Sequence, residues 1–592
     1  MLLMKKIFHD LFLLLLLIVM FSCSTVNFGE TKKHLNHVKY LASDDLEGRK
    51  PGTEGGKKAA EYIKNTFVNN GLELYEGSGF QYFDVTTNAY LGSKNTLSYN
   101  GKKFNVDNDF IPLSFGKNTS LDTSIFIAGY GFDFRNDSLE WNDYRNENCK
   151  GKWVMILRGS PDDNNPHGQF YEHSSLRKKS IVAKDNEAAG VIFISSSNFD
   201  QEDKLIKLSY DQSQNDIGIP IIHIRRNIAN QILKNQNTSV DELEVKAKSQ
   251  KNKFVHFSTT EKLYVTTDIG FEKKETQNVI AFLPGKNEKL KEEYIIIGAH
   301  YDHIGYGGDG SGSRRPYINA VHNGADDNAS GVSVILELSE MLSKISNQRT
   351  ICFVAFGAEE MGLIGSKYFV NSNYLPNEKI QIMINLDMIG RLNDKKTLSI
   401  GGTKTAENLE KIIKESVQKS SLNATYSGDG YGPSDHSSFY IKNIPVMYAF
   451  TGGHNDYHTP NDDFDKINYK GLEKIENLLF STVTNFDKID KLKFQKTSEK
   501  NPGRPARFKV TLGIMPDYVF KEIKGLRIDA VTPGRPAYKS GIKSGDIIIE
   551  INGKSVSDIY EYMHRLGEIN PGDTVDVKVI RSKKELIFPV TF

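Results

Sequence analysis

The sequence predicts an α/β fold in which a mixed, mostly parallel sheet is flanked by helices, with a β-rich domain inserted into it and a further domain after it. Three stretches, at 294–298, Thr350–Phe356 and Ile380–Leu386, are largely apolar, as expected for strands buried on both faces. Between the first two, residues 331–342 carry apolar side chains at helical spacing. This repeat of strand, loop and helix indicates an α/β core.

Two helices are expected ahead of these strands, at 32–41 and 53–70, because apolar residues recur there at helical spacing and Thr53 can cap the second helix. The segment 44–49 between them is predicted to be a polar loop. From about residue 109 to 257 the chain changes to short apolar runs separated by Gly, Asn and Asp, which indicates an inserted β-rich domain. Strands are expected at 124–130, 152–157, 190–195 and 219–223, and helices at 180–189 and 227–234.

The predicted domain boundaries follow from these changes of pattern. The α/β core takes 23–108 and 258–495, and the insertion takes 109–257. Residues 496–505 are charged and then contain Pro and Gly, which predicts a linker. Residues 506–592 have the pattern of strands around two short helices and are predicted to form a separate C-terminal domain.

The N-terminal segment 1–22 is typical of an export signal. Lys5 and Lys6 precede an apolar run at 11–20 that is too short to span a bilayer. Cys23 comes just after this run and resembles the cysteine that carries the lipid in bacterial lipoproteins. We therefore expect an exported protein that is anchored through Cys23 to a membrane of a bacterial cell envelope, on its periplasmic or outer face.

Charge and cysteine content exclude some partners and frameworks. The chain has 75 basic and 74 acidic residues and no basic stripe, so electrostatics gives no case for nucleic acid as a partner. Besides Cys23, only Cys149 and Cys352 occur, and they lie far apart in the sequence. This pair gives no disulfide framework, and both are predicted to be buried free thiols.

Five segments of the core carry side chains that can bind a metal ion, at or near the ends of predicted strands and helices. Three of the segments follow the buried strands, at the carboxyl edge where open α/β sheets bind ligands. The segments are Gly298-Ala299-His300-Tyr301-Asp302, Gly324-Ala325-Asp326-Asp327-Asn328, Gly357-Ala358-Glu359-Glu360, Leu386-Asp387-Met388 and Tyr457-His458-Thr459-Pro460. Imidazole and carboxylate ligands without thiolate fit a catalytic zinc site. Two histidines and three carboxylates are too many for one four-coordinate zinc with an open position, but suffice for two ions if one carboxylate bridges.

Each segment taken alone is more often structural than catalytic, since a pair of aspartates before a helix can simply cap it. Together and in this order, the five segments resemble the di-zinc aminopeptidases of peptidase family M28. The resemblance implies two zinc ions per chain, held by two pairs of ligands around a bridging aspartate. The pairs are His300 with Asp387 and Glu360 with His458, and the bridge is Asp327 rather than Asp326.

The same resemblance implies further roles. Glu359 matches the general base of the family, which takes a proton from a zinc-activated water and returns it to the departing amine. Tyr457 matches a tyrosine that stabilises the tetrahedral intermediate in some members, with simple packing as its alternative. Asp302 matches the carboxylate that fixes the tautomer of the ligand histidine. His303 is expected to line the mouth of the site, and His436 belongs to a segment that resembles a family loop near the substrate; for both, ordinary loop polarity is the alternative.

The flanking domains also show resemblances. Gly151-Lys152-Trp153-Val154 and Ala188-Ala189-Gly190-Val191-Ile192 resemble segments of a protease-associated domain, which would shape substrate access or be a passive insertion. Leu512-Gly513-Ile514-Met515 and Ile551-Asn552-Gly553 resemble segments of a PDZ domain. Such a domain accepts an extended C-terminal peptide as an added strand.

The predicted function is a zinc-dependent exopeptidase, most simply an aminopeptidase that removes N-terminal residues from peptides. A carboxypeptidase or dipeptidase with the same chemistry stays open, because the group that pairs with the charged end of the substrate cannot be placed from sequence. A non-catalytic peptide-binding relative is the third hypothesis, and the complete set of ligand and base positions disfavours it.

Overall fold

The computed structural model describes residues 32–592, apart from 136–138, 146–147, 164, 166–167, 212–214, 251–255, 309–310, 498–508 and 518–522. The predicted export signal, Cys23 and residues 498–505 of the predicted linker lie outside the described residues. The chain divides into two compact units. The first holds Met1–Val85 and Lys274–Lys500, and the second holds Thr86–Lys273 and Asn501–Phe592.

The first unit is built on a mixed sheet whose central four strands, β15, β14, β16 and β19, run parallel. Antiparallel pairing with β13 on one side and with β17 on the other makes the sheet mixed. The spatial order is β1 (Glu73–Leu74), β13 (Ile269–Leu283), β15 (Thr350–Phe356), β14 (Tyr294–His300), β16 (Ile380–Leu386), β19 (Val446–Phe450), β17 (Thr397–Gly401) and β18 (Asn423–Tyr426), with β2 (Phe80–Leu91) paired to β13.

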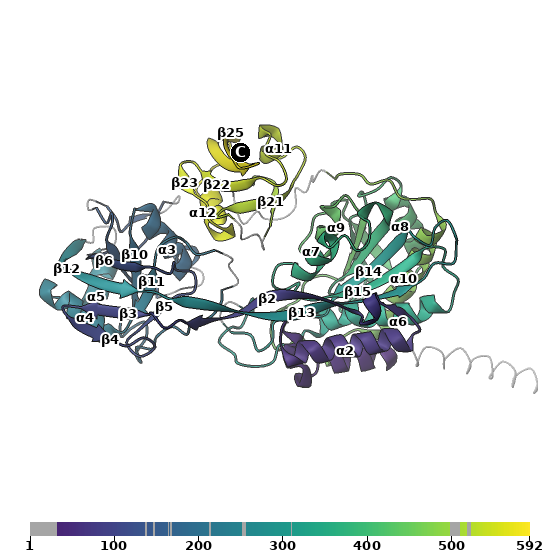
Figure 1. Ribbon diagram of the computed structural model, residues 1–592, viewed down its shortest axis with the longest axis horizontal. Helices are drawn as coiled ribbons and strands as arrows, with labels where there is room; N and C mark the ends of the chain where they lie inside the picture. Colours follow the sequence, from purple (N-terminus) through teal and green to yellow (C-terminus); the bar gives the residue numbers. More distant parts are fainter. Residues whose placement is uncertain are drawn as a thin grey trace, which may run out of the picture. The chain divides into compact units, whose positions relative to one another are not determined.

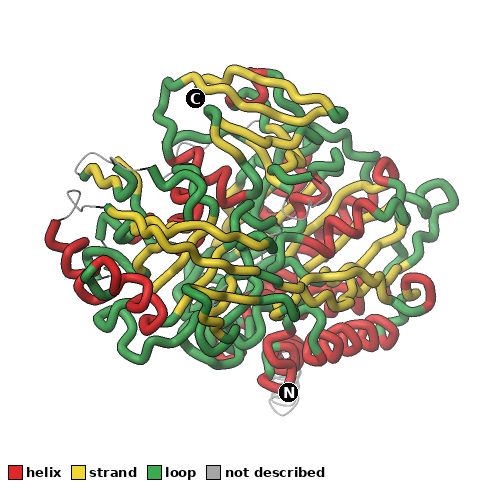
Figure 2. Tube along the Cα trace, turned by 60° about the vertical axis from the view of Figure 1, so that its left-hand side comes forward, coloured by secondary structure: helices red, strands yellow, loops and turns green. Residues whose placement is uncertain are grey.

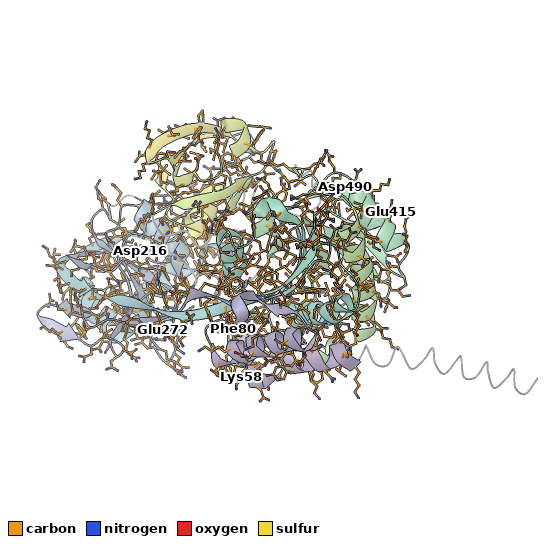
Figure 3. All side chains as sticks on the ribbon, turned by 45° about the vertical axis from the view of Figure 1, so that its right-hand side comes forward. Lys58, Phe80, Asp216, Glu272, Glu415 and Asp490 are labelled. Atoms are coloured by element: carbon orange, nitrogen blue, oxygen red, sulfur yellow. The ribbon has the colours of Figure 1, made fainter. Side chains whose placement is uncertain are left out.

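Helices cover both faces of this sheet (Figure 1). One apolar core holds α2 (Glu54–Asn69), α6 (Gly331–Ser343), α8 (Leu409–Gln418) and α10 (Tyr469–Lys488) against one face, together with the helix 32–41. A second core holds α7 (Ile364–Asn371) and α9 (His436–Tyr440) against the other face. The outer sides of the helices are polar, and Lys58 on α2 and Glu415 on α8 lie at the surface (Figure 3). The layered arrangement explains why the central strands are apolar throughout.

The second unit contains two sheets that are not part of this core. The strands of the first are, in spatial order, β4 (Lys102–Phe104), β3 (Thr96–Tyr99), β12 (Phe257–Thr266), β6 (Ser120–Ile127), β9 (Trp153–Leu157), β10 (Gly190–Ile194), β11 (Ile221–Ile224) and β5 (Phe110–Pro112). The inserted part of the chain also contains the two-stranded ribbon of β7 (Asp133–Arg135) and β8 (Glu140–Asn142). Its α-helices are α3 (Leu176–Asp185), α4 (Arg226–Leu233) and α5 (Val240–Gln250).

The other sheet of the second unit belongs to the C-terminal segment, whose strands are drawn in yellow in Figure 2. Its strands are β20 (Ile514–Pro516), β21 (Leu526–Val531), β22 (Ile547–Ile551), β23 (Lys554–Ser555), β24 (Thr574–Arg581) and β25 (Lys584–Thr591), and its helices are α11 (Pro536–Ser540) and α12 (Ile559–Gly567). Fifteen buried apolar residues, all from this segment, form its own core. The prediction of an α/β core with a β-rich insertion and a separate C-terminal segment of strands and two short helices is confirmed.

Most predicted elements of the first unit are confirmed, and Thr53 caps α2 by accepting a hydrogen bond from the backbone N–H of Gly56. The prediction of a polar loop at 44–49 is wrong, because this segment is a 3₁₀ turn that buries the side chain of Arg49. Cys149 and Cys352 are buried and free, as predicted. The described part of the chain contains no helix with the length and apolarity needed to cross a bilayer.

Candidate metal centre

The site lies where three parallel strands end side by side. His300 is the last residue of β14 and pairs in register with Phe356, the last residue of β15. The loop after β15 carries Glu359 and Glu360, and Asp387 directly follows β16. Neighbouring parallel strands therefore deliver an imidazole and several carboxylates to one edge of the sheet, as expected for open α/β sheets.

Asp327 comes from a different direction, on the segment Ala325–Ser330 that precedes α6. The backbone N–H groups of Asp326 and Asp327 both donate to one carboxylate oxygen of Asp462, at 2.9 and 3.0 Å. The side chain of Asp326 is already engaged, because it accepts from the backbone N–H of Gly390 at 2.6 Å and lies 3.1 Å from His454 Nε2. The carboxylate of Asp327 is thus the one that is directed at the ends of the strands.

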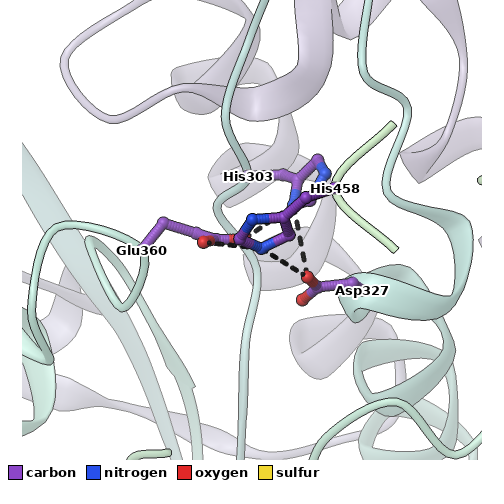
Figure 4. Close-up of side chains that lie close together, drawn as sticks. All are labelled: His303, Asp327, Glu360 and His458. Carbon is purple, nitrogen blue, oxygen red and sulfur yellow. Dashed lines mark hydrogen bonds and ion pairs between the residues drawn. The ribbon is translucent and has the colours of Figure 1, made fainter. Parts of the chain in front are cut away.

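Two groups of potential metal-binding atoms meet at Asp327. One group contains His300, Asp327 and Asp387, and the other contains His303, Asp327, Glu360 and His458. Asp327 Oδ1 lies 3.2 Å from His300 Nε2, and Asp327 Oδ2 lies 3.2 Å from His458 Nε2. His300 Nε2 lies 3.5 Å from Asp387 Oδ1. His458 Nε2 lies 3.1 Å from Glu360 Oε2, and these two side chains are drawn with Asp327 in Figure 4.

These distances fit zinc better than direct ion pairing. Ligand atoms about 2.0 Å from one tetrahedral zinc lie roughly 3.3 Å apart, which is close to all four distances. His458 Nε2 is buried and makes no hydrogen bond, although two carboxylate oxygens lie nearby. A buried imidazole nitrogen beside two carboxylate oxygens, with no hydrogen bond of its own, is available as a metal ligand. The clustering of several carboxylates in one enclosed place also calls for a compensating cation.

The groups of this site shift each other's pKa values. Burial by itself would raise the pKa of Asp327, but the imidazoles of His300 and His458, each 3.2 Å from one of its oxygens, hold it well below its usual range. Burial would also raise the pKa of Glu360, but the neighbouring histidines lower it to about 2. Burial would lower the pKa of His458, but Glu360 and Asp327 raise it to about 11. Asp327 and Glu360 are therefore ionised at neutral pH, as carboxylate ligands must be.

Glu359 differs from its neighbour Glu360. Desolvation raises the pKa of Glu359 well above its usual value, and the carboxylates of Glu360, Asp435 and Asp387 raise it further. Its backbone N–H donates to Asp302 Oδ1 at 3.0 Å, and the N–H of Glu360 donates to Asp302 Oδ2 at 3.3 Å. Glu359 belongs to neither group of potential ligands, so its carboxylate is left available beside them.

Asp302 is placed differently from the expectation that its carboxylate fixes the His300 tautomer. His300 Nδ1 lies 3.2 Å from the backbone oxygen of Asp302 but 3.8 Å from its carboxylate. The backbone oxygen is thus the acceptor that defines the imidazole, because it leaves Nε2 free to face Asp327 and Asp387. The carboxylate instead supports the segment that carries Glu359 and Glu360.

The ring of Tyr457 stacks on the ring of His458, with centroids 3.9 Å apart. Desolvation and the carboxylates of the site raise its pKa, so the phenol keeps its proton at neutral pH. His303 is fully buried beside Glu360, inside the site rather than at its mouth. His436 is buried as well, and its ring stacks on that of Tyr448.

Sequence reasoning missed the residues that support this centre. Arg49 is fully buried and donates hydrogen bonds to four backbone oxygens, among them those of Tyr301, Asn323 and Gly324. Asp462 fixes the backbone before Asp327, and its other oxygen accepts from Arg391 at 3.0 Å. A charged residue in a loop gives no sign in the sequence that it is buried, so no pattern pointed to either residue.

This combination of fold and site defines a metal-dependent hydrolase. The potential metal ligands lie at the ligand-binding edge of an α/β sheet, and a carboxylate that can act as a base lies beside them. Sequence profiles of known families match three parts of the chain. The profile of peptidase family M28 matches residues 278–483, that of the PA domain matches 127–232, and that of the PDZ domain matches 494–591. The predicted resemblance to peptidase family M28, with an inserted protease-associated domain and a C-terminal PDZ domain, is confirmed by these matches.

Several curated and solved proteins are similar to this chain. Aminopeptidase YwaD of Bacillus subtilis is 25% identical over 396 residues, which cover 64% of this chain and 70% of that protein. An aminopeptidase of Pseudomonas aeruginosa is 25% identical over 370 residues, which cover 61% of this chain and 57% of that protein. Among solved structures, the zinc aminopeptidase BSAP from Bacillus subtilis matches with a TM-score of 0.48 and 22% identity over 79% of this chain and 97% of that one.

Proposed function

We propose that this protein is a zinc-dependent aminopeptidase that hydrolyses N-terminal residues from peptides with two zinc ions per chain. One observation carries the proposal: each carboxylate oxygen of Asp327 lies 3.2 Å from the Nε2 atom of a different histidine. A bridging carboxylate is what two metal ions in one site require. The family assignment and the names of the curated relatives support the choice of aminopeptidase.

The proposed ligands form two sets that share Asp327. His300 and Asp387 bind one zinc with it, and Glu360 and His458 bind the other. Zinc, when bound, supplies Lewis acidity that polarises a water molecule and the scissile carbonyl. The protein fixes the positions of these donor atoms. The ends of the strands hold some of them, and the segment supported by Asp462 holds Asp327.

Glu359 is the proposed general base. Its carboxylate accepts a proton from the attacking water and later delivers it to the departing nitrogen, so that one group serves both halves of the reaction. Asp302 holds the backbone of Glu359 in place through its hydrogen bond. Tyr457, which keeps its proton, is the proposed donor to the oxyanion that forms on the substrate carbonyl.

The decisive experiment replaces Glu359 by glutamine in the purified chain. Glu359→Gln is expected to retain two zinc ions, by elemental analysis, while kcat on a peptide substrate falls by about 10²- to 10⁴-fold. Glu415→Gln, which changes an exposed residue of α8, is the matched control and should leave both quantities unchanged. Wild-type rates in Glu359→Gln would sink the proposed mechanism, and one zinc per wild-type chain would sink the proposed count.

A panel of peptides blocked at one end separates the exopeptidase alternatives. The proposal requires cleavage of peptides with a free amino terminus and an amidated carboxyl end, and no cleavage of acetylated peptides with a free carboxylate. The reverse preference identifies a carboxypeptidase, and cleavage only of peptides free at both ends identifies a dipeptidase. Binding of peptides without any cleavage by the zinc-loaded chain identifies a non-catalytic relative.

The domain boundaries and the membrane anchor belong to the same proposal. We assign 23–108 and 258–495 to the peptidase core, 109–257 to the protease-associated domain and 506–592 to the PDZ domain, with 496–505 as linker. The PDZ domain is proposed to bind peptide C termini. Lipid on Cys23 is proposed to hold the exported protein at a bacterial envelope membrane. Cys23→Ala should then move the protein from the membrane to the soluble fraction, and unchanged membrane retention would end this part of the proposal.

A further inference from the structure

His303 is the one member of the metal-site clusters to which the proposed mechanism gives no role. Its ring is fully buried, and its Nδ1 lies 2.8 Å from Glu360 Oε1. The ring meets that of His458 edge-on, with centroids 5.5 Å apart (Figure 4). Glu360 is therefore held by two histidines, one at each carboxylate oxygen, since His458 Nε2 lies 3.1 Å from Oε2.

The two contacts of Glu360 differ in kind. The distance of 3.1 Å between Glu360 Oε2 and His458 Nε2 is close to the separation of two ligands of one zinc, roughly 3.3 Å. The distance of 2.8 Å to His303 Nδ1 is shorter and is that of a charge-assisted hydrogen bond. His303 Nδ1 also lies 3.8 Å from the nearest oxygen of Asp327, farther than His458 Nε2 does. His303 is thus placed as a hydrogen-bond donor to the outer oxygen of Glu360.

The protonation pattern of the ring agrees with this role. His303 Nε2 is buried and has no hydrogen-bond partner. If Nδ1 were a metal ligand, Nε2 would carry the proton, and a buried N–H donor would be left without an acceptor. If Nδ1 carries the proton and donates a hydrogen bond to Glu360, then Nε2 is left only with an acceptor lone pair that has no hydrogen-bond partner.

The backbone around His303 keeps the ring in this orientation. Gly324 lies close to the imidazole: an added Cβ would come within 2.6 Å of the ring atoms Cγ and Cδ2 and within 2.1 Å of the backbone oxygen of Asp327. The φ angle of Gly324 is +54°, in the left-handed region that glycine adopts most readily. The absence of a side chain at residue 324 therefore lets the ring pack directly on the segment that leads to Asp327.

We infer that His303 is a positioning residue that orients the carboxylate of Glu360 and so sets the affinity of the zinc site formed by Asp327, Glu360 and His458. The inference rests on the proposed function for the identity of that metal. Donors that hold ligand carboxylates in this way contribute about 10- to 100-fold to metal affinity. The other site, at His300 and Asp387, has no contact of this kind with His303, so the effect is confined to one of the two ions.

The test compares three substitutions in the zinc-loaded full chain by competition with a chromogenic zinc chelator. The amide nitrogen of asparagine can take the place of Nδ1, whereas that of glutamine takes the place of Nε2. His303→Asn should therefore hold the second zinc nearly as well as wild type, while His303→Gln and His303→Ala should release it about 10- to 100-fold more readily. His34→Ala is the matched control, because His34 is an equally buried histidine 3.1 Å from a carboxylate, that of Glu476.

Each result decides. Weakening of one zinc in the glutamine and alanine variants alone, with both ions retained by His34→Ala, supports the inference. Wild-type affinity in His303→Ala overturns it, and so does equal weakening in all three variants, which would make His303 a ligand or a merely structural residue. A wild-type chain with a single zinc that His303→Ala weakens supports the inference while ending the proposal of two ions. A wild-type chain that binds no zinc ends both.

Discussion

Replacing Arg49 by methionine is expected to destabilise the first unit and to weaken zinc binding together. The guanidinium donates to the backbone oxygens of Tyr301 and Asn323 at 2.7 Å, to that of Gly324 at 2.9 Å, and to that of Leu41. Three of these oxygens belong to the segments that carry the proposed ligands. One side chain thus ties the segment after β14 to the segment before Asp327. Burial lowers the pKa of Arg49 to about 10, so it remains charged at neutral pH.

The magnitude follows from what the substitution leaves behind. Arg49→Met fills similar space but leaves four buried carbonyl oxygens without their donor, each at a cost of about 1–3 kcal/mol. Part of this cost is offset, because methionine does not carry the desolvation penalty of a buried guanidinium. Removal of a buried charged partner typically lowers the free energy of unfolding by about 3–5 kcal/mol in total. For a unit of this size about 2 °C is lost per kcal/mol, so the unfolding midpoint should fall by roughly 6–10 °C.

Calorimetry and chelator competition together test this reasoning. Arg349→Met is the matched control, because Arg349 is equally buried and bonds to Glu293 and to the backbone of Asp487, away from the metal centre. Both variants should lose stability, but only Arg49→Met should also lose zinc affinity. The reasoning is refuted if Arg49→Met binds zinc as tightly as the control variant does, whatever its stability.

Two further predictions concern single side chains. Tyr457→Phe should lower kcat by about 10²-fold with zinc content unchanged, because it removes one proposed donor to the oxyanion; steady-state kinetics checks this, and an unchanged kcat leaves the tyrosine with a packing role only. In the second unit, His223 accepts from the N–H of Ile206 and pairs with Ser195, and burial lowers its pKa to about 3. The unfolded chain takes up a proton between about pH 6.5 and pH 3 that the folded one does not, so this unit should lose stability as the pH falls through that window, by at most about 1.4 kcal/mol per pH unit. His223→Gln should flatten this slope in thermal scans, and an equally steep slope in the variant would contradict the assignment.

The central sheet could be predicted from sequence because its strands are buried on both faces. The runs Thr350–Phe356 and Ile380–Leu386 match β15 and β16 residue for residue. Both faces of such a strand are buried, so nearly every residue is apolar and the strand shows in the sequence as a continuous apolar run. β14 extends two residues past its predicted end, through Ala299 to His300, because the strand continues into the site itself.

The helix predicted at 180–189 begins four residues earlier, at Leu176, and ends at Asp185. Ser175 caps it by accepting from the backbone N–H of Lys178. The sequence hides this start because Lys179 has a charged side chain that is nevertheless buried. Its ammonium donates to the backbone oxygens of Leu157 and Gly159, residues that only the fold brings near. Charged residues with distant backbone partners therefore break the periodicity from which helix limits are predicted.

The same limit applies at the metal centre. His300, Glu360 and Asp387 lie at or shortly after strand ends and Asp327 lies just before α6, where sequence pattern can locate them, whereas His458 lies in the loop after β19. The structure gathers the five proposed ligands in two groups. Arg49 and Asp462 act through backbone groups more than a hundred residues away, so neither spacing nor composition can reveal them. What a sequence predicts well is the set of side chains placed by regular elements, and what it misses is the support that tertiary contacts provide.

The charge balance of the site leads to a last prediction, on metal removal. A cluster of carboxylates lies here, and the charged side chain of Arg49 donates to the surrounding backbone. The cluster includes the carboxylates of Asp302, Asp327, Glu359, Glu360, Asp387 and Asp435. Histidine protonation would compensate only in part, and a protonated imidazole cannot bind metal. Binding of cations should therefore stabilise the folded first unit, since the unfolded chain does not gather these groups.

The size of this stabilisation depends on how tightly the ions bind. At free zinc 1,000-fold above the dissociation constant, one site adds about 4.1 kcal/mol to the stability of the folded state. Chelation should then lower the unfolding midpoint of the first unit by several degrees, while the second unit, which holds none of the proposed ligands, should unfold at an unchanged temperature. Calorimetry with and without chelator resolves the two transitions. No shift in the first unit would show that the carboxylate cluster is stable by itself and that metal binding is not coupled to its folding. Equal shifts in both units would contradict the placement of the metal in the first unit alone.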